Sequence, residues 1–196
     1  RSAKIGDVLD LGPAFGDMCL EAAATGPLHL LAAGSGITPM IATVRALAAN
    51  GMPRPLSLHY WARRPAELAF VDELRALTRR HAHFQVRFHL TQARAVHQDE
   101  SQGRIDDATF ATETDTLAHS TVLACGPQGF VDHARSLLAH RVAAFVSESF
   151  TPITAHSDDK GDVAVTMASS QRTLVVPRGT PLLTALEALG VPLASG

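Results

Sequence analysis

The sequence predicts an α/β fold in which a parallel sheet of five strands carries helices on both faces. Short apolar runs such as residues 28–33 and 121–125 lack the polar–apolar alternation of a half-exposed strand. Such runs are typical of strands that are buried on both faces. Segments with helical apolar spacing separate them, and strands that alternate with helices in this way imply right-handed crossovers and parallel pairing.

The elements between residues 27 and 150 can be placed by their end signals. In the first helix, Thr38 is expected as the N-cap, Pro39 as the first helical residue and Gly51 just beyond the end. Polar residues 92–102 show no period and are interpreted as a loop. We expect strands at 28–33, 56–61, 84–90, 121–125 and 143–146, a helix opened by Pro65, and another helix at 128–140.

Two shorter segments flank this α/β domain, which we place at residues 27–150. Residues 1–26 carry strand and turn patterns punctuated by glycine and proline, and they show no helical period. A polar linker at 151–161 leads to residues 162–196, which start with a hairpin pattern around residues 169–171 and continue with a short helix at 181–189. Neither end segment looks complete, so we expect the chain to be cut from a longer protein at both ends.

Composition excludes several classes of protein. Hydrophobic residues make up 46% of the chain and charged residues 18%, which indicates a soluble globular protein. A formal net charge of −2 gives no reason to expect nucleic acid or an anionic membrane as a partner. No apolar run is long enough to span a bilayer.

Cysteine and histidine usage argues against a metal site. The chain has 2 cysteines, Cys19 and Cys125, which cannot form a disulfide framework or a four-thiolate site. We expect both to be reduced thiols in a cytoplasmic protein. Among 10 histidines the densest group is His81, His83 and His89, which we interpret as solvent-facing because no other ligand lies at metal-binding spacing.

The strongest local signal is the run Gly34-Ser35-Gly36-Ile37-Thr38-Pro39 between a buried strand and a helix start. The two glycines allow a tight turn and a close approach to a ligand, and the helix start favours a pyrophosphate. An ordinary glycine-rich turn is the alternative, and the dinucleotide fingerprint has glycine where this chain has Pro39.

Two other groups of residues follow predicted strands. Where the fingerprint expects an acid for the adenosine ribose, this chain has Arg63 and Arg64, which can accept a 2′-phosphate or simply face solvent. This pair favours NADPH over NADH only slightly. Cys125, Gly126 and Pro127 end a later strand, where a thiol either points into the ligand crevice or is a small buried core residue. Taken alone, Cys125 is better interpreted as a core residue.

Together these motifs resemble those of the ferredoxin–NADP reductase superfamily. The resemblance rests on a G-x-G-x-T-P loop at 34–39, a C-G-P motif at 125–127 and an E-x-F ending at Glu148-Ser149-Phe150. Residues 6–16 resemble the end of a flavin-binding β-barrel, and Gly103-Arg104-Ile105 resembles an element of the oxygenase-reductase branch. Residues 162–196 resemble the start of a β-grasp 2Fe–2S ferredoxin domain, whose cluster ligands would lie beyond Gly196.

The resemblance implies an electron-transfer route from NAD(P)H through flavin to a 2Fe–2S centre. The acceptor would be an oxygenase, a desaturase or a haem monooxygenase, and FAD is favoured over FMN. Residues 34–39, including Ser35, would hold the pyrophosphate and ribose, and Cys125 would lie beside the nicotinamide. Glu148 and Phe150 would lie at the flavin ring, with Cys125 and Glu148 as the catalytic residues.

Two alternatives remain open at this point. A dehydrogenase acting on a small carbonyl substrate needs an acid–base pair, but Tyr60 is followed four residues later by Arg64 and not by lysine. The chain could also be a nucleotide-binding fragment without activity of its own.

Overall fold

The computed structural model describes residues 4–8, 18, 26–111, 114–150, 161–168, 170–188 and 190. The chain forms two compact units, one of residues 16–151 and one that combines 1–15 with 152–196. Most of the predicted barrel end at 1–26, Cys19 included, lies outside the described residues, as do nearly all of the linker at 151–161 and the end of the chain from residue 191.

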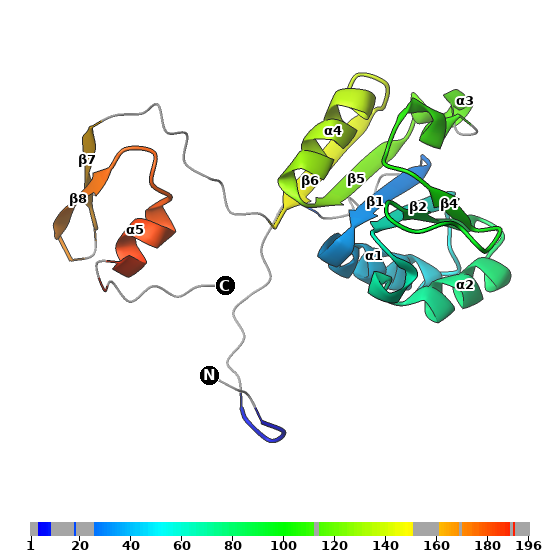
Figure 1. Cartoon of the computed structure of the whole chain (residues 1–196), viewed down its shortest axis with the longest axis horizontal. Coiled ribbons are helices and arrows are strands. Elements are labelled where there is room, and N and C mark those ends of the chain that lie inside the picture. Colours follow the sequence, from blue (N-terminus) through cyan, green and yellow to red (C-terminus); the bar gives the residue numbers. More distant parts are fainter. Residues whose placement is uncertain are drawn as a thin grey trace. The chain divides into compact units, whose positions relative to one another are not determined.

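The larger unit is built on a fully parallel sheet, which confirms the predicted fold class (Figure 1). The strand order is β4-β3-β2-β1-β5-β6. The sheet has 6 strands and not the five predicted. The strands are β1 (Leu28–Ala33), β2 (Leu56–Ala62), β3 (Phe84–Leu90), β4 (Glu100–Gln102), β5 (Thr121–Gly126) and β6 (Ala144–Ser149).

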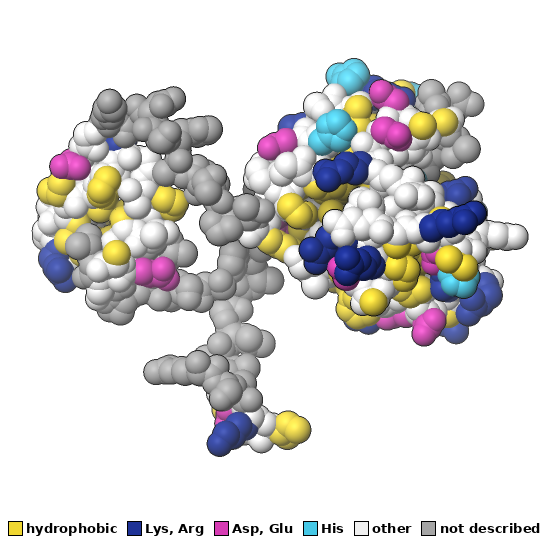
Figure 2. All heavy atoms as spheres, viewed as in Figure 1, with side chains coloured by type: hydrophobic (Ala, Val, Ile, Leu, Met, Phe, Trp, Pro, Cys, Tyr) yellow, Lys and Arg dark blue, Asp and Glu magenta, His cyan; other side chains and the backbone are white. Residues whose placement is uncertain are grey.

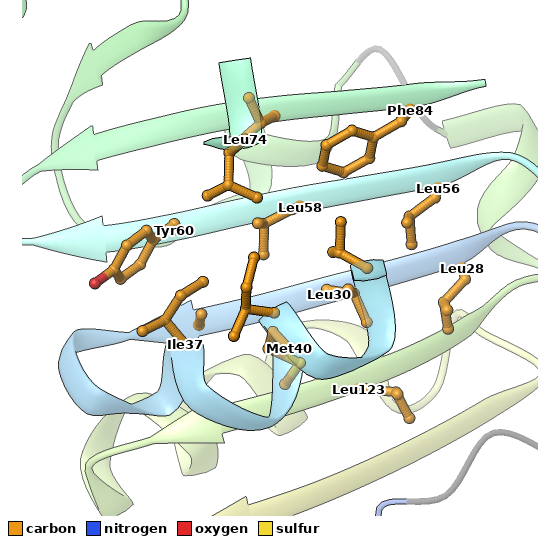
Figure 3. Close-up of a cluster of buried hydrophobic side chains, with 14 of the residues drawn as sticks. Leu28, Leu30, Ile37, Met40, Leu56, Leu58, Tyr60, Leu74, Phe84 and Leu123 are labelled. Atoms are coloured by element: carbon orange, nitrogen blue, oxygen red, sulfur yellow. The ribbon is translucent and has the colours of Figure 1, made fainter. Parts of the chain in front are cut away.

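Helices cover both faces of this sheet because successive strand residues point to opposite sides. In β1, Leu30 packs with the cluster under α1 (Ile37–Ala49) and α2 (Val71–Arg80), whereas Leu31 packs with the cluster under α4 (Gln128–Leu138). Figure 3 shows the first cluster, with Met40 of α1 and Leu74 of α2 lying over the leucines of β1 and β2. Burying each such leucine contributes about 1.5–3 kcal/mol.

The extra strand, β4, lies inside the segment predicted to be a loop. Its residues are polar, so the hydrophobic pattern gives no sign of it. Polar contacts hold it instead: Arg75 Nε donates to Asp99 Oδ2 at 2.7 Å, and Arg75 Nη2 donates to Glu100 Oε1 at 3.3 Å. The Ser101 hydroxyl lies 2.7 Å from Nδ1 of His89 on β3. These side-chain hydrogen bonds therefore add to the backbone pairing of this short edge strand with β3.

Several predicted helix ends were wrong. A 3₁₀ turn, η1 (Gly34–Gly36), precedes α1, so the N-cap is Gly36 and Thr38 lies within the first turn, where its hydroxyl donates to the Ser35 carbonyl at 3.0 Å. Pro65 opens only a second 3₁₀ turn, η2 (Pro65–Glu67). Phe70 then adopts φ 61°, in the left-handed region, before α2 begins at Val71. α4 ends two residues before the predicted limit, and β6 runs on to Ser149.

The prediction of solvent-facing histidines was wrong for His89. His83 is exposed, but the side chain of His89 is 6% exposed. Its Nε2 atom lies 3.0 Å from Nδ1 of His59 on β2. Aromatic contacts cover this pair from the α4 side, because Phe110 of η3 (Asp107–Phe110) lies 5.3 Å from the His59 ring. Among the described residues no group of three potential ligands could hold a metal ion, and no helix is long and apolar enough to cross a membrane.

The smaller unit contains an antiparallel hairpin and one helix. Strand β7 (Asp162–Thr166) pairs with β8 (Thr173–Pro177), as the hairpin pattern predicted, and α5 (Leu182–Ala188) follows. Val176 of β8 and Ala185 and Leu186 of α5 are buried. Hydrophobic side chains also reach the surface of this unit (Figure 2), where Val175 is 65% exposed.

Candidate functional site

The motifs singled out in the sequence follow neighbouring strands and meet at one edge of the sheet. Strands β2, β1, β5 and β6 lie side by side in that order and are parallel, so their carboxyl ends share an edge. In the register, Ala33 is level with Trp61, Ala32 with Cys125, and Cys125 with Glu148. The loops of residues 34–39, 63–64 and 125–127 and the E-x-F ending therefore lie together. This edge is where open α/β sheets bind their ligands.

Two glycines bring the first loop and the C-G-P loop into backbone contact. A Cβ atom on Gly36 would overlap the carbonyl oxygen of Cys125 and would lie 2.8 Å from the Gly126 nitrogen. A Cβ atom on Gly126 would lie 2.9 Å from the Cβ of Ala33. Gly34 has φ 56°, a conformation that side-chain-bearing residues seldom adopt. The two loops thus meet at points where a Cβ atom on either glycine would be too close to its neighbours.

The exposed part of this structure has the properties of an anion site. Gly34, Ser35 and Thr38 are exposed, and they surround the start of α1. Because η1 runs directly into α1 and its carbonyls accept from the Ile37 amide, the amides that lack a preceding helical turn are those of η1 itself. The helix dipole adds positive potential at this end. The first turn of α1 contains no acidic residue that would oppose this potential. A phosphate group is therefore favoured at this position.

Cys125 is part of the core beneath α1. Its side chain is 0% exposed and packs in the cluster that contains Leu123 and Met40. Burial, with a smaller contribution from the nearby Glu148 carboxylate, raises the pKa of the Cys125 thiol to about 11. The thiol is consequently neutral at physiological pH. The exposed part of this motif is Pro127.

The E-x-F ending lies next to the C-G-P loop. Glu148, level with Cys125 on the neighbouring strand, is exposed. Phe150 follows β6 directly and is 48% exposed, which is unusual for a large aromatic side chain. An exposed carboxylate and an exposed aromatic ring therefore follow the strand next to the two glycine loops.

Arg63 and Arg64 lie just beyond the carboxyl end of β2, and both are exposed. Arg63 is not free, because its Nε atom donates to Glu67 Oε2 at 3.1 Å. Hydrogen bonding from Arg63 is the main factor that lowers the pKa of Glu67. The sequence analysis missed Glu67 because it comes four residues after the strand-end position.

Trp61 is a second residue that the sequence analysis missed. It is 3% exposed and stacks on His89 with ring centroids 4.2 Å apart, and its ring lies 5.2 Å from that of Phe130 in α4. Its buried Nε1 atom has no hydrogen-bond partner within the described parts of the chain. The sequence feature that could have identified Trp61 is its place near the end of the strand, directly before Ala62 and the two arginines.

One depression on the described surface lies away from this edge. It measures about 470 Å³ and is lined by Arg75, Thr78, Val86, Asp99 and neighbouring residues of α2 and β3. Arg75 and Asp99 are already paired with each other there, and the depression is widely open. This depression therefore does not mark the candidate site, which is inferred instead from the meeting of the strand-end motifs.

Comparison with known families agrees with this arrangement. Residues 30–136 match the model of the oxidoreductase NAD-binding domain. The chain belongs to this family. It is also 32% identical, over its full length, to NADH oxidoreductase HCR of Escherichia coli K12, of which it spans 58%. The chain thus corresponds to little more than half of that relative.

Solved structures extend the comparison. A flavohemoglobin from Malassezia yamatoensis, determined with bound FAD and heme, is 32% identical and matches with a TM-score of 0.60 over 70% of this chain and 36% of its own. Phthalate dioxygenase reductase matches with a TM-score of 0.55 at 24% identity, over 92% of this chain and 53% of its own. The family match and these relatives confirm the resemblance to the ferredoxin–NADP reductase superfamily.

Proposed function

We propose that this chain is the nucleotide-binding part of an NAD(P)H-dependent flavoprotein reductase. The observation that carries the proposal is the backbone contact of Gly36 with Cys125 and Gly126. This contact joins a phosphate-compatible helix start to a second loop on the neighbouring strand, so that one extended ligand can lie across both. A dinucleotide has the corresponding shape, with a pyrophosphate between two nucleosides.

The first loop would contact the pyrophosphate and the adjoining ribose, which NADH and NADPH have in common. Gly34, Ser35 and Gly36 would hold the pyrophosphate with their backbone amides, and Thr38 and Pro39 would border the ribose. The adenosine would lie over the end of β2, near Arg63 and Arg64. Gly34 leaves room for the ligand's close approach, because a Cβ atom there would meet nothing within 4 Å, whereas the space beside Gly36 is filled by the Cys125 carbonyl.

The residues at the second loop would orient the nicotinamide. The bound coenzyme supplies a hydride, which the flavin converts into single electrons. Gly126 and Pro127 would border the nicotinamide, with the neutral Cys125 thiol beneath them. Glu148 and the exposed Phe150 would face the flavin ring, whose planar surface suits an aromatic partner. FAD is favoured over FMN, in keeping with the FAD of the related flavohemoglobin.

Onward electron transfer would use residues outside this chain. With 2 cysteines, the chain cannot supply the four thiolates that a plant-type 2Fe–2S cluster needs. We propose that the cluster belongs to a further part of the protein, and that it passes electrons to an oxygenase, a desaturase or a haem monooxygenase. Named relatives include reductase components of propane 2-monooxygenase and terephthalate 1,2-dioxygenase. The buried free thiol of Cys125 fits a reducing compartment such as the cytoplasm.

The small-carbonyl dehydrogenase finds no support at this site. Tyr60 is 1% exposed, and its hydroxyl accepts a hydrogen bond from the Ala69 amide at 3.3 Å. Burial raises the pKa of the Tyr60 phenol, which makes proton donation to a substrate harder. Because Tyr60 is buried and its hydroxyl is hydrogen-bonded to the backbone, it is out of reach as the catalytic acid of such a dehydrogenase.

A fluorescence titration tests the proposed function. Trp61 is the single tryptophan of the chain and lies next to the proposed adenosine position, and the reduced nicotinamide absorbs light where tryptophan emits. NADH should therefore quench the emission with saturation. Ser35→Glu places a negative charge at the proposed pyrophosphate position and should weaken binding at least about tenfold.

The matched control is Ser136→Glu, at an exposed serine of α4 that is not part of the proposed site. It should leave the titration unchanged. Lack of saturable quenching by NADH and NADPH in the wild-type chain, or equal affinities for the wild type and Ser35→Glu, would contradict the proposal.

A further inference from the structure

A carboxylate occupies the end of β2 although the sequence has no acid there. Glu67 Oε2 accepts hydrogen bonds from the Arg63 backbone amide at 3.3 Å and from Arg63 Nε at 3.1 Å. The 3₁₀ turn η2 produces this contact, because the Glu67 amide donates to the Arg64 carbonyl at 3.0 Å and so folds the chain back. Glu67 thereby reaches the strand end through a turn.

In a dinucleotide-binding sheet, the end of the second strand lies beside the adenosine ribose of the bound coenzyme. A carboxylate at the end of the second strand accepts hydrogen bonds from the ribose hydroxyls of the adenosine, and it repels a 2′-phosphate. Both hydrogen bonds to Arg63 use Oε2 of Glu67, so Oε1 is on the side of the carboxylate away from these contacts. Glu67 is exposed, so a ligand can reach it.

The same contact changes the role of the arginines. Arg63 and Arg64 together offer two positive charges to a 2′-phosphate, but Glu67 neutralises one of them by pairing with Arg63. Arg64 is exposed. A 2′-phosphate would have to displace Glu67 from Arg63 or rely on Arg64, and it would meet the negative charge of Glu67 in either case.

We propose that Glu67 is the residue that determines coenzyme preference, and that it favours NADH over NADPH. It accepts a hydrogen bond from the adenosine ribose and keeps Arg63 from binding a 2′-phosphate. This inference rests on the proposed function, because it requires that the carboxyl edge of the sheet binds a nicotinamide nucleotide.

Calorimetric titration of the full chain with NADH and with NADPH tests it. The wild type should bind NADH more tightly. Glu67→Gln removes the charge but keeps the shape, and it should tighten NADPH binding about tenfold while weakening NADH binding severalfold. Adding Arg64→Gln to this variant should cancel the gain for NADPH. ADP-ribose and its 2′-phosphate derivative should show the same pattern, which would locate the effect at the adenosine half.

Asp107→Asn is the matched control. Asp107 is an exposed acid paired with Arg141 at 3.0 Å, and Arg141 comes just before β6, at the opposite edge of the sheet. This variant should leave both affinities unchanged, and the denaturation midpoint should confirm that each variant is folded.

The outcomes separate the two proposals. A wild type that prefers NADPH, or a Glu67→Gln variant in which both affinities change by the same factor, would overturn the role of Glu67 and leave the proposed function standing. A wild type that binds neither nucleotide nor ADP-ribose would overturn the proposed function, and this inference with it.

Discussion

Gly36 and Gly126 are the residues at which the candidate site is most sensitive to change. A Cβ atom on Gly36 would meet only backbone atoms of Cys125 and Gly126, and one on Gly126 would meet Ala33 and the ring of Phe130. The glycines of this motif were predicted from the sequence, because a strand–glycine–helix pattern has a known backbone requirement. What the sequence could not show is that Gly36 contacts Cys125, since that contact depends on which strands are neighbours.

Replacing Gly36 with alanine should destabilise the protein and abolish nucleotide binding. The new methyl group would overlap the Cys125 carbonyl, and forced overpacking of this kind costs about 1–3 kcal/mol or more. Chemical denaturation measures the cost. Gly129→Ala is the control, because a Cβ atom there meets nothing within 4 Å and alanine is the better helix former. A Gly36→Ala variant as stable as the wild type would contradict the described contact.

Cys125 should make the stability depend on alkaline pH. Its pKa is about 11 in the folded protein, above the ordinary value of 9.0 for a cysteine, so the neutral thiol is favoured by folding. The associated stability is fully present below about pH 9 and is lost as the pH rises toward about 11. Cys125→Ala should flatten this part of the curve, as measured by denaturation at several pH values. A wild type and a variant with parallel curves between these pH values would show that the thiol is not buried as described.

Arg63 and Arg64 should affect one coenzyme more than the other. If Arg64, the arginine that is not paired with Glu67, holds a 2′-phosphate, replacing both arginines with alanine should weaken NADPH binding roughly ten- to a hundredfold, the equivalent of about 1.5–3 kcal/mol, and should hardly change NADH binding. The loop of residues 34–39 contacts the part that both coenzymes share. Titration of both nucleotides against the double variant measures the difference. Equal losses, or none, would mean that these arginines only face water.

At the scale of elements, strands with an apolar pattern could be predicted and elements held by polar contacts could not. β1 was predictable because five of its six residues are apolar, whereas β4 is polar and accepts a hydrogen bond from Arg75 of α2 at Glu100. The break between η2 and α2 was equally hidden, because nothing in the sequence marks Phe70 for a left-handed conformation. Long-range polar contacts and a left-handed residue produce no periodic pattern of apolar residues, so these features could not be predicted from the sequence.

Arg75 should control whether β4 stays on the sheet. Arg75→Ala removes the hydrogen bonds to Asp99 and Glu100, and the partly exposed pair should contribute about 1–2 kcal/mol. Amide hydrogen exchange should then speed up at residues 97–102 more than in the central strands. Arg79→Ala, at an exposed position one turn further along α2, should leave the exchange unchanged. Unchanged exchange at β4 in Arg75→Ala would show that backbone pairing alone holds the strand.

At the scale of the whole molecule, the sequence patterns predicted the parallel sheet and the hairpin, while the identity of the flanking segments as parts of a flavin barrel and a ferredoxin domain depended on resemblance alone. The hairpin of β7 and β8 has the predicted pairing, yet two strands and one short helix bury few side chains. The packing of this unit therefore does not indicate its role, which has to be tested by measuring which cofactors the chain binds.

The purified chain should contain no stoichiometric iron–sulfur cluster and little flavin. Its 2 cysteines cannot supply four thiolates, and Phe150 and Glu148 alone offer few contacts to a flavin. Metal analysis and an absorbance spectrum of the 196-residue chain measure both. One cluster per chain, bound by its own residues, would show that residues 162–196 have been misinterpreted.

The most direct test of the account is amide hydrogen exchange of the chain with and without saturating NADH. The account predicts that NADH slows exchange at residues 34–39, 61–67 and 125–130, which lie at the carboxyl edge of the sheet. Exchange at the opposite edge, around residues 51–55 and 81–83, should not change. Protection confined to that opposite edge or to the smaller unit, with none in the two glycine loops, would contradict the central claim that these loops form the nucleotide site.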